Sequence, residues 1–176
     1  MSSFQPMLFR CIAVAALIAG SPAMAHAQTS AAPPTERDHA VVFELGWAGD
    51  WSPDDGVHAG GGTVAFEVTP IERWLEIEVG ATVIRSHLST ETSVDLLLKK
   101  PWTISRKVEF MAGIGPELIH ATDADGTHVG VSVIADLMVW PKRNVGWYLE
   151  PGYEEAFPAA GVRRGFGFAA GLLIGR

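Results

Sequence analysis

The sequence predicts an all-β fold, a single eight-stranded antiparallel up-and-down transmembrane β-barrel. Three observations lead to this prediction. Apolar residues recur at every second position in eight segments, the connections between these segments alternate between two compositions, and the tryptophans lie near the ends of the segments. Alternation with period two is typical of strands whose two faces meet different surroundings.

The eight predicted strands each carry one apolar face. In chain order they cover residues 41–47, 64–68, 75–83, 94–98, 108–118, 129–139, 147–153 and 166–174. Their apolar members are, strand by strand, Val41, Phe43, Leu45 and Trp47; Val64, Phe66 and Val68; Leu75, Ile77, Val79, Ala81 and Val83; Val94, Leu96 and Leu98; Val108, Phe110, Ala112, Ile114 and Leu118; Val129, Val131, Val133, Ala135, Leu137 and Val139; Trp147, Leu149 and Tyr153; Phe166, Phe168, Ala170, Leu172 and Ile174. The seventh strand is the weakest because Pro151 has no backbone N–H to donate.

The opposite face of the same strands is small or acidic. If the apolar face points outward, nine acids point into the lumen, and Lys99 and Lys107 are the bases expected near them, at the rim. Buried carboxylates are costly unless they are protonated, hydrated, bound to a cation or paired with a base. The predicted lumen acids are Glu44, Glu67, Glu76, Glu78, Asp95, Glu109, Glu117, Asp136 and Glu150.

The connections decide which face meets lipid, because a soluble sandwich or lipocalin-type barrel also alternates. Compact turns are predicted at 70–73, 99–106 and 141–144, and these are rich in lysine and arginine. The other connections are acidic, with Asp50, Asp54, Asp55, Glu91, Asp123, Asp125, Glu154 and Glu155. Two rims of opposite charge favour a barrel that crosses a membrane and closes all its backbone hydrogen bonds.

The tryptophans support the same orientation. Trp74, Trp102, Trp140 and Trp147 fall at the end with the compact turns, whereas Trp47 and Trp51 fall at the other end. Aromatic residues gather at both interfaces of membrane proteins. We therefore expect an interface girdle of Trp47, Trp74, Trp102, Trp140 and Trp147, against the alternative of tryptophans scattered over core positions.

The N-terminal part of the chain is predicted to lie outside the barrel. Arg10 precedes the apolar run 11–20, and Ala25-His26-Ala27 is typical of a cleavage site, so residues 1–27 are predicted to be a secretory signal peptide. Residues 28–39 are polar and contain two prolines, which predicts a flexible leader. Residues 40–176 then form the β-barrel domain.

Two stretches carry a resemblance to a known family. Gly113-Ile114-Gly115-Pro116 lies within a predicted strand, and the alternating run from Gly165 to Ile174 forms the last one. With the strand and turn rhythm of residues 40–176, the chain resembles the small outer-membrane β-barrel proteins, the family that includes the membrane domain of outer-membrane protein A. The resemblance implies a place in the Gram-negative cell outer membrane after export through the general secretory pathway. It also implies outer-membrane lipids and the barrel assembly machinery as partners.

Composition excludes several classes of function. The net charge is −7, which argues against nucleic acid as a partner, and the one cysteine, Cys11, falls in the predicted signal peptide. We expect no enzyme, no cofactor and no catalytic or metal-ligating set, because His58, His87, His120 and His128 have no ligand spacing and no nucleophile motif is present.

Three functions remain open. The first is a structural or interaction role in the outer membrane. The second is a porin-like, cation-preferring transport function through the acidic lumen. The third is a soluble periplasmic barrel that binds an apolar ligand.

Overall fold

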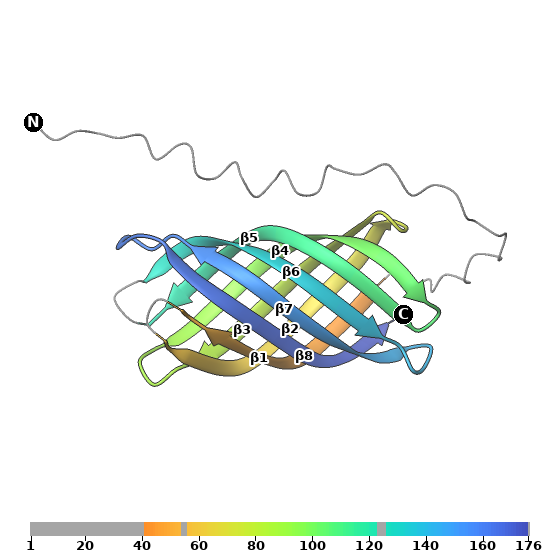
Figure 1. Ribbon diagram of the computed structural model, residues 1–176, viewed down its shortest axis with the longest axis horizontal. Coiled ribbons are helices and arrows are strands. Elements are labelled where there is room, and N and C mark those ends of the chain that lie inside the picture. Colours follow the sequence, from red (N-terminus) through yellow and green to blue (C-terminus); the bar gives the residue numbers. More distant parts are fainter. Residues whose placement is uncertain (1–40, 54–55, 123–125, 176) are drawn as a thin grey trace, which may run out of the picture. The chain divides into compact units, whose positions relative to one another are not determined.

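The computed structural model describes residues 41–53, 56–122 and 126–175, and these form a closed barrel of eight antiparallel strands (Figure 1). The fold class predicted from the sequence is confirmed. The predicted signal peptide 1–27 and leader 28–39 lie outside the described residues. The strands are β1 (Val41–Trp51), β2 (His58–Ile71), β3 (Leu75–Arg85), β4 (Thr90–Ser105), β5 (Val108–Ala121), β6 (Thr127–Val139), β7 (Val145–Ala156) and β8 (Arg163–Gly175).

Closure comes from the pairing of the first strand with the last. β1 and β8 are antiparallel neighbours from Val42, opposite Gly175, to Trp51, opposite Phe166. A closed barrel leaves no open strand edge, so backbone groups are satisfied between strands, as a membrane interior requires. No helix in the described part of the chain is long and apolar enough to span a membrane.

The apolar faces of the strands point away from the barrel axis. Leu45, Phe66 and Leu172 are 52%, 48% and 58% exposed, whereas Glu44 and Glu67 on the opposite face are each 2% exposed. A soluble barrel buries its apolar face, so this arrangement contradicts the third function left open above. Large exposed apolar surfaces mark contact with lipid or with another protein.

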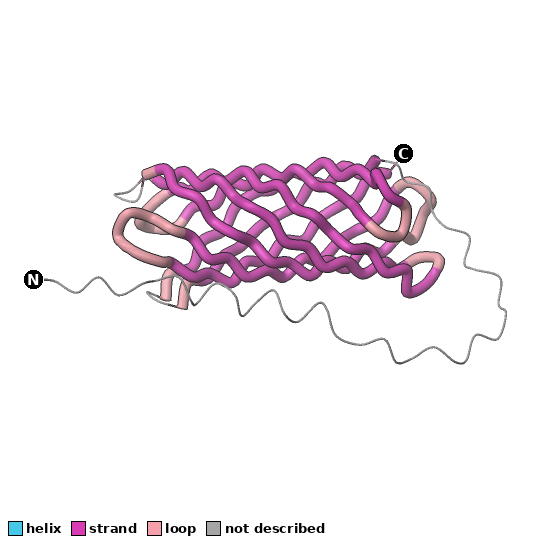
Figure 2. The backbone as a smooth tube through the Cα atoms, turned by 90° about the horizontal axis from the view of Figure 1, so that it is seen from above, coloured by secondary structure: helices cyan, strands magenta, loops and turns pink. Residues whose placement is uncertain are grey.

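The connections fall into two sets, and most are short (Figure 2). We call the end that carries the β2–β3, β4–β5 and β6–β7 connections the turn end, and the opposite end the loop end. Val41 and Gly175, the first and last described residues, both lie at the turn end. On the loop end, β3 and β4 are separated only by residues 86–89, and β7 and β8 by residues 157–162.

Strand β4 differs from its predicted range. The sequence predicted a compact turn over 99–106, but β4 continues to Ser105 and the turn is only Arg106 and Lys107. The run Lys99-Lys100-Pro101 has a turn-like composition, yet it pairs residue by residue with β5, from Lys99 opposite Gly113 to Thr103 opposite Glu109. Cross-strand pairing therefore outweighs local composition at this position.

Pro116 and Pro151 lie in the middle of strands, and each interrupts pairing on one side only. Pro151 of β7 pairs with Phe168 of β8, but the β6–β7 pairing has a gap between Gly152 and Leu149. Pro116 produces the same gap between β4 and β5 while it pairs with Val131 of β6. A proline lacks the N–H that would bond to one neighbour. The seventh strand, weak in the sequence, is thus continuous in the fold.

Candidate functional site

The turn end of the lumen is filled by apolar side chains. We call this group the apolar plug; each member is at most 4% exposed. Such complete burial leaves little space between the side chains, as in other protein cores. Its members are Val42, Met111, Met138, Trp140, Tyr148 and Leu173.

Trp140 belongs to this plug, so its assignment to the interface girdle was wrong. It is 1% exposed, and its backbone N–H donates to the Lys107 carbonyl oxygen at 2.8 Å. The alternation of β6 explains its position, because Asp136 and Met138 point inward and Trp140 has the same parity. The sequence contained this information, because Asp136, Met138 and Trp140 are spaced two residues apart.

The other four girdle tryptophans lie on the outer surface. Trp47, Trp74, Trp102 and Trp147 are 55%, 60%, 46% and 44% exposed. Trp102 contacts the Phe110 ring at a centroid distance of 5.8 Å, near the turn end. Near the loop end, aromatic rings also gather outside the barrel, with Trp51 stacked on Phe166 at 5.8 Å and Trp47 beside Phe168 at 6.3 Å.

The nine predicted lumen acids occupy three levels of the interior. Glu44, Glu67, Glu78 and Asp136 are almost completely buried near the middle of the barrel. Glu76 and Glu109 lie towards the turn end and are partly buried. Asp95, Glu117 and Glu150 line a cavity towards the loop end.

Lys99 lies among the buried acids. Its Nζ is 3.2 Å from Asp136 Oδ2, 3.2 Å from Glu150 Oε2 and 3.4 Å from Glu67 Oε2, and it also contacts Glu78 Oε2. We call these five residues the Lys99 cluster. It joins β2, β3, β4, β6 and β7, so one ammonium connects five of the eight strands.

The sequence placed Lys99 at the rim of the lumen, and that position was wrong. Because β4 runs on to Ser105, Lys99 is an interior strand residue with a side chain that is 0% exposed. Lys99 lies an even number of positions along the strand from Asp95 and Leu97, and both of these face inward, so its side chain also points into the lumen. A buried charge needs such partners, since an isolated ion in a protein interior is very costly.

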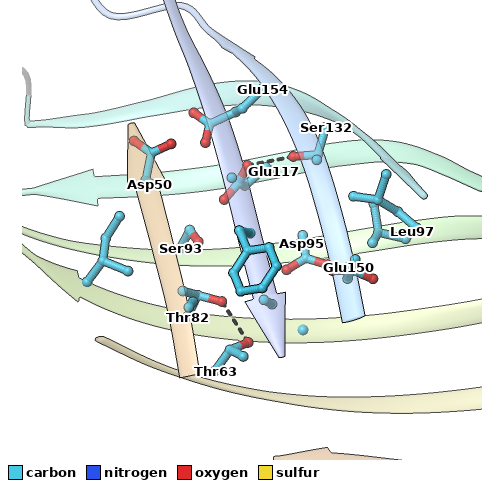
Figure 3. A pocket seen from close by; sticks show the side chains of 18 of the residues that line it. Asp50, Thr63, Thr82, Ser93, Asp95, Leu97, Glu117, Ser132, Glu150 and Glu154 are labelled. Carbon is cyan, nitrogen blue, oxygen red and sulfur yellow. Dashed lines mark hydrogen bonds between the residues drawn. The ribbon is translucent and has the colours of Figure 1, made fainter. Parts of the chain in front are cut away.

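A cavity of about 130 Å³ lies between the Lys99 cluster and the loop end. Figure 3 shows side chains of its lining. The cavity has room for several water molecules. Two hydrogen bonds cross its wall, from Thr82 Oγ1 to Thr63 Oγ1 and from Ser132 Oγ to Glu117 Oε2, both 2.8 Å long. Seven acids line it: Asp50, Glu78, Glu91, Asp95, Glu117, Glu150 and Glu154.

Three of these acids were predicted to lie in loops. Asp50, Glu91 and Glu154 instead lie within strands, near the loop ends of β1, β4 and β7 respectively. Their side chains point inward and line the cavity. Their parity matches that of Glu44, Asp95 and Glu150, so extending the strand pattern would have identified them. Arg163 meets Glu91 at the loop end of the cavity, with Nη2 2.6 Å from Oε2.

The described histidines do not assemble a site with the acids. His128 is 7% exposed, and neither ring nitrogen has a hydrogen-bond partner, whereas Ser132 on the same strand bonds to Glu117. His120 contacts Thr127 at 2.8 Å, and His58 stacks on Trp51. In the described ranges, no group of three potential metal ligands includes a histidine.

Known proteins resemble this chain in fold. No protein-family model and no curated protein matches the sequence. The crystal structure of Neisserial surface protein A matches with a TM-score of 0.58 and 17% identity, over 76% of this chain and 94% of that one. The crystal structure of the N-terminal β-barrel domain of Pseudomonas aeruginosa OprF matches with a TM-score of 0.53 and 9% identity, over 77% of this chain and 98% of that one.

A third structure is Ail, the attachment invasion locus protein of Yersinia pestis. Its TM-score is 0.50 at 12% identity, over 76% of this chain and 97% of that one. The protein therefore has the fold of the small eight-stranded outer-membrane barrels, to which outer-membrane protein A also belongs.

Proposed function

We propose that this protein is a small, non-conducting β-barrel of the Gram-negative outer membrane, with a structural or interaction role and no catalytic activity. The observation that carries the proposal is the filled interior. Below the cavity, the Lys99 cluster and the apolar plug occupy the lumen down to the turn end. Eight-stranded barrels have an interior just wide enough to be filled by side chains.

The outer surface supports the proposed localisation. The outward apolar face and the exposed aromatic residues near both ends suit a bilayer with two polar interfaces. Export through the general secretory pathway, contact with outer-membrane lipids and insertion by the barrel assembly machinery belong to this proposal. The net charge of −7 gives no reason to expect a nucleic-acid partner.

The loop end is the surface available to a partner outside the cell. Connections as short as residues 86–89 offer little area, whereas a stable protein interface buries roughly 800 Å² on each partner. The proposed interaction role is therefore a small contact or a lipid contact rather than a large docking surface.

Fractionation tests the localisation. When the full chain is expressed in a Gram-negative host, it is expected in the outer-membrane fraction, extractable only with detergent and with heat-modifiable migration on a gel. Release with the osmotic-shock fluid would contradict the proposal.

A cation-preferring pore is the second candidate, favoured by the seven acids around the cavity. Planar-bilayer recording separates the two candidates, with a porin in the same membrane as the positive control. The filled lumen predicts no current steps at neutral pH. Cation-selective steps would replace the first proposal with the second.

A further inference from the structure

We propose that the barrel holds one Ca²⁺ ion between Glu44, Glu67 and Asp136, the last two of which also belong to the Lys99 cluster. One oxygen from each of these three carboxylates lies within 4.8 Å of the other two. The three side chains come from β1, β2 and β6, and their residues are 2%, 2% and 0% exposed. The inference does not depend on the proposed function.

Lys99 has too few N–H donors to satisfy all of these carboxylates. An ammonium group has three N–H bonds. The nearest carboxylate oxygens, on Glu78, Asp136 and Glu150, are sufficient to use all three, and Glu67 lies farther away at 3.4 Å. The second oxygen of Asp136 and the carboxylate of Glu44 are left over, and Glu67 keeps only the longer contact of its Oε2 with Lys99 Nζ.

Two of these carboxylate oxygens, on Glu44 and Asp136, have no hydrogen-bond partner among the described residues, and Glu67 Oε2 has only the 3.4 Å contact with Lys99 Nζ. Glu44 Oε1, Glu67 Oε2 and Asp136 Oδ1 are buried and accept no hydrogen bond in the structure. Glu44 makes no ion pair with any described residue, although its side chain lies with those of Glu67 and Asp136. Buried unsatisfied carboxylates are among the most costly groups in a protein interior, so a cation there would remove a large penalty.

The charge balance requires more than one cation if the acids are ionised. Glu67, Glu78, Asp136 and Glu150 surround a single ammonium, and Glu44 lies with Glu67 and Asp136. A divalent ion bound by Glu44, Glu67 and Asp136 offsets two of the surplus negative charges. It also ties β1, which contributes nothing to the Lys99 cluster, to strands on the other side of the lumen.

The ligand chemistry favours Ca²⁺ over other metals. All three ligands are carboxylate oxygens, with no sulfur or imidazole, which suits a hard cation. Ca²⁺ binds oxygen at about 2.3–2.6 Å, so two ligands across the ion are separated by up to about 5 Å. Mg²⁺ needs about 2.1 Å and an octahedral shell, which would draw opposite oxygens to about 4.2 Å.

The cavity reaches the Lys99 cluster, to which two of the three proposed ligands, Glu67 and Asp136, belong. Glu78 and Glu150 belong both to the Lys99 cluster and to the cavity lining, so the cavity reaches the cluster from the loop end. The acids along it, such as Asp50 and Asp95, attract cations towards the barrel centre. Ser93, 8% exposed, also lines the cavity with an oxygen suited to an ion or its water.

Calorimetry on the refolded protein tests the site. The protein is refolded in detergent without lipopolysaccharide, checked by heat-modifiable migration, stripped with EDTA and titrated with CaCl₂. One ion per barrel is expected, and the midpoint of thermal unfolding should rise by roughly 5–10 °C at a hundredfold excess over Kd. MgCl₂ should bind at least about tenfold more weakly.

Variants localise the ion. Glu44→Gln keeps the side-chain shape but removes a charged ligand, so its Ca²⁺ affinity should fall at least about tenfold. Glu109→Gln removes another partly buried acid outside the site and should leave the affinity unchanged.

Several outcomes would overturn the assignment. A folded wild-type barrel that binds no Ca²⁺ at millimolar concentration shows that protons, not a metal, neutralise the three acids. Equal Mg²⁺ binding contradicts the choice of metal, and an unchanged affinity in Glu44→Gln contradicts the location. If Glu44→Gln does not fold, the Ca²⁺ affinity of Asp136→Asn, compared with that of the wild-type protein, tests the location instead. Conductance or fractionation results bear on the proposed function and leave this test unaffected.

Discussion

Lys99 is the residue on which the charge balance of the lumen depends. Its Nζ contacts four carboxylates, and its side chain is inaccessible to solvent. The net stability of a buried ion pair is often small, because desolvation offsets the attraction. Removing only one partner is different, because the remaining charges stay buried without a counterion.

Replacing Lys99 by methionine is therefore expected to destabilise the barrel by about 3–5 kcal/mol. The physical reason is the burial of Glu78, Asp136 and Glu150 without their common donor. Urea unfolding in lipid vesicles, followed by tryptophan fluorescence, measures the change.

Lys100→Met is the matched control. The neighbouring ammonium donates to the Arg73 carbonyl oxygen and lies 5.9 Å from the centroid of the Trp102 ring, outside the Lys99 cluster. A loss of at most about 1 kcal/mol is expected. Equal losses in the two variants would show that Lys99 does not hold the lumen together.

At the scale of elements, the pairing of β2 with β3 depends on a close approach at Gly61. A Cβ atom added there would lie 1.9 Å from the Val83 carbonyl oxygen, which is far inside van der Waals contact. At the next residue, Gly62, the nearest atom to such a Cβ is the Gly46 carbonyl oxygen at 3.8 Å. The Gly60-Gly61-Gly62 run thus contains one position that requires glycine for space and one that does not.

Gly61→Ala is expected to destabilise the barrel by about 1–3 kcal/mol, because the strands must separate to admit the methyl group. Gly62→Ala should leave stability unchanged or raise it slightly, since it reduces the freedom of the unfolded chain. The same urea titration compares the two variants. A Gly61→Ala protein as stable as Gly62→Ala would contradict the β2–β3 register.

The strands were largely predictable from the sequence, whereas their ends were not. Alternation identified all eight strands, because each separates an apolar exterior from a polar interior. Local composition then misplaced Lys99 and the loop-end acids, since a run of bases or acids resembles a turn when considered alone. The position of Trp140 beside the 141–144 turn likewise suggested a place in the girdle. Extending the alternation by two or three residues would have corrected each of these assignments.

The groupings inside the lumen could not be predicted in this way. Glu44, Glu67 and Asp136 lie on three strands and are far apart in the sequence. The alternation along a strand shows which face each residue lies on. The height of a residue along the barrel, however, depends on the registers between all intervening strands. Those registers include bulges, as between Val68 and Ile71 opposite β3.

At the scale of the whole molecule, the protein reverses the arrangement of a soluble barrel. Its exterior carries exposed side chains such as Leu96, Ile114 and Phe168, and its interior carries the acids and Lys99. Backbone closure makes this arrangement possible in lipid. The apolar plug at the turn end is the part of the interior that resembles a soluble core.

Fluorescence quenching by brominated phospholipids tests this reversed arrangement most directly. Two proteins are prepared in vesicles, each retaining one tryptophan, either Trp102 or Trp140, with the others changed to phenylalanine. Both residues lie near the turn end, but Trp102 is 46% exposed and Trp140 only 1%. Strong quenching of Trp102 and weak quenching of Trp140 are expected. Equal quenching of the two, or stronger quenching of Trp140, would contradict an outward apolar face around a filled lumen.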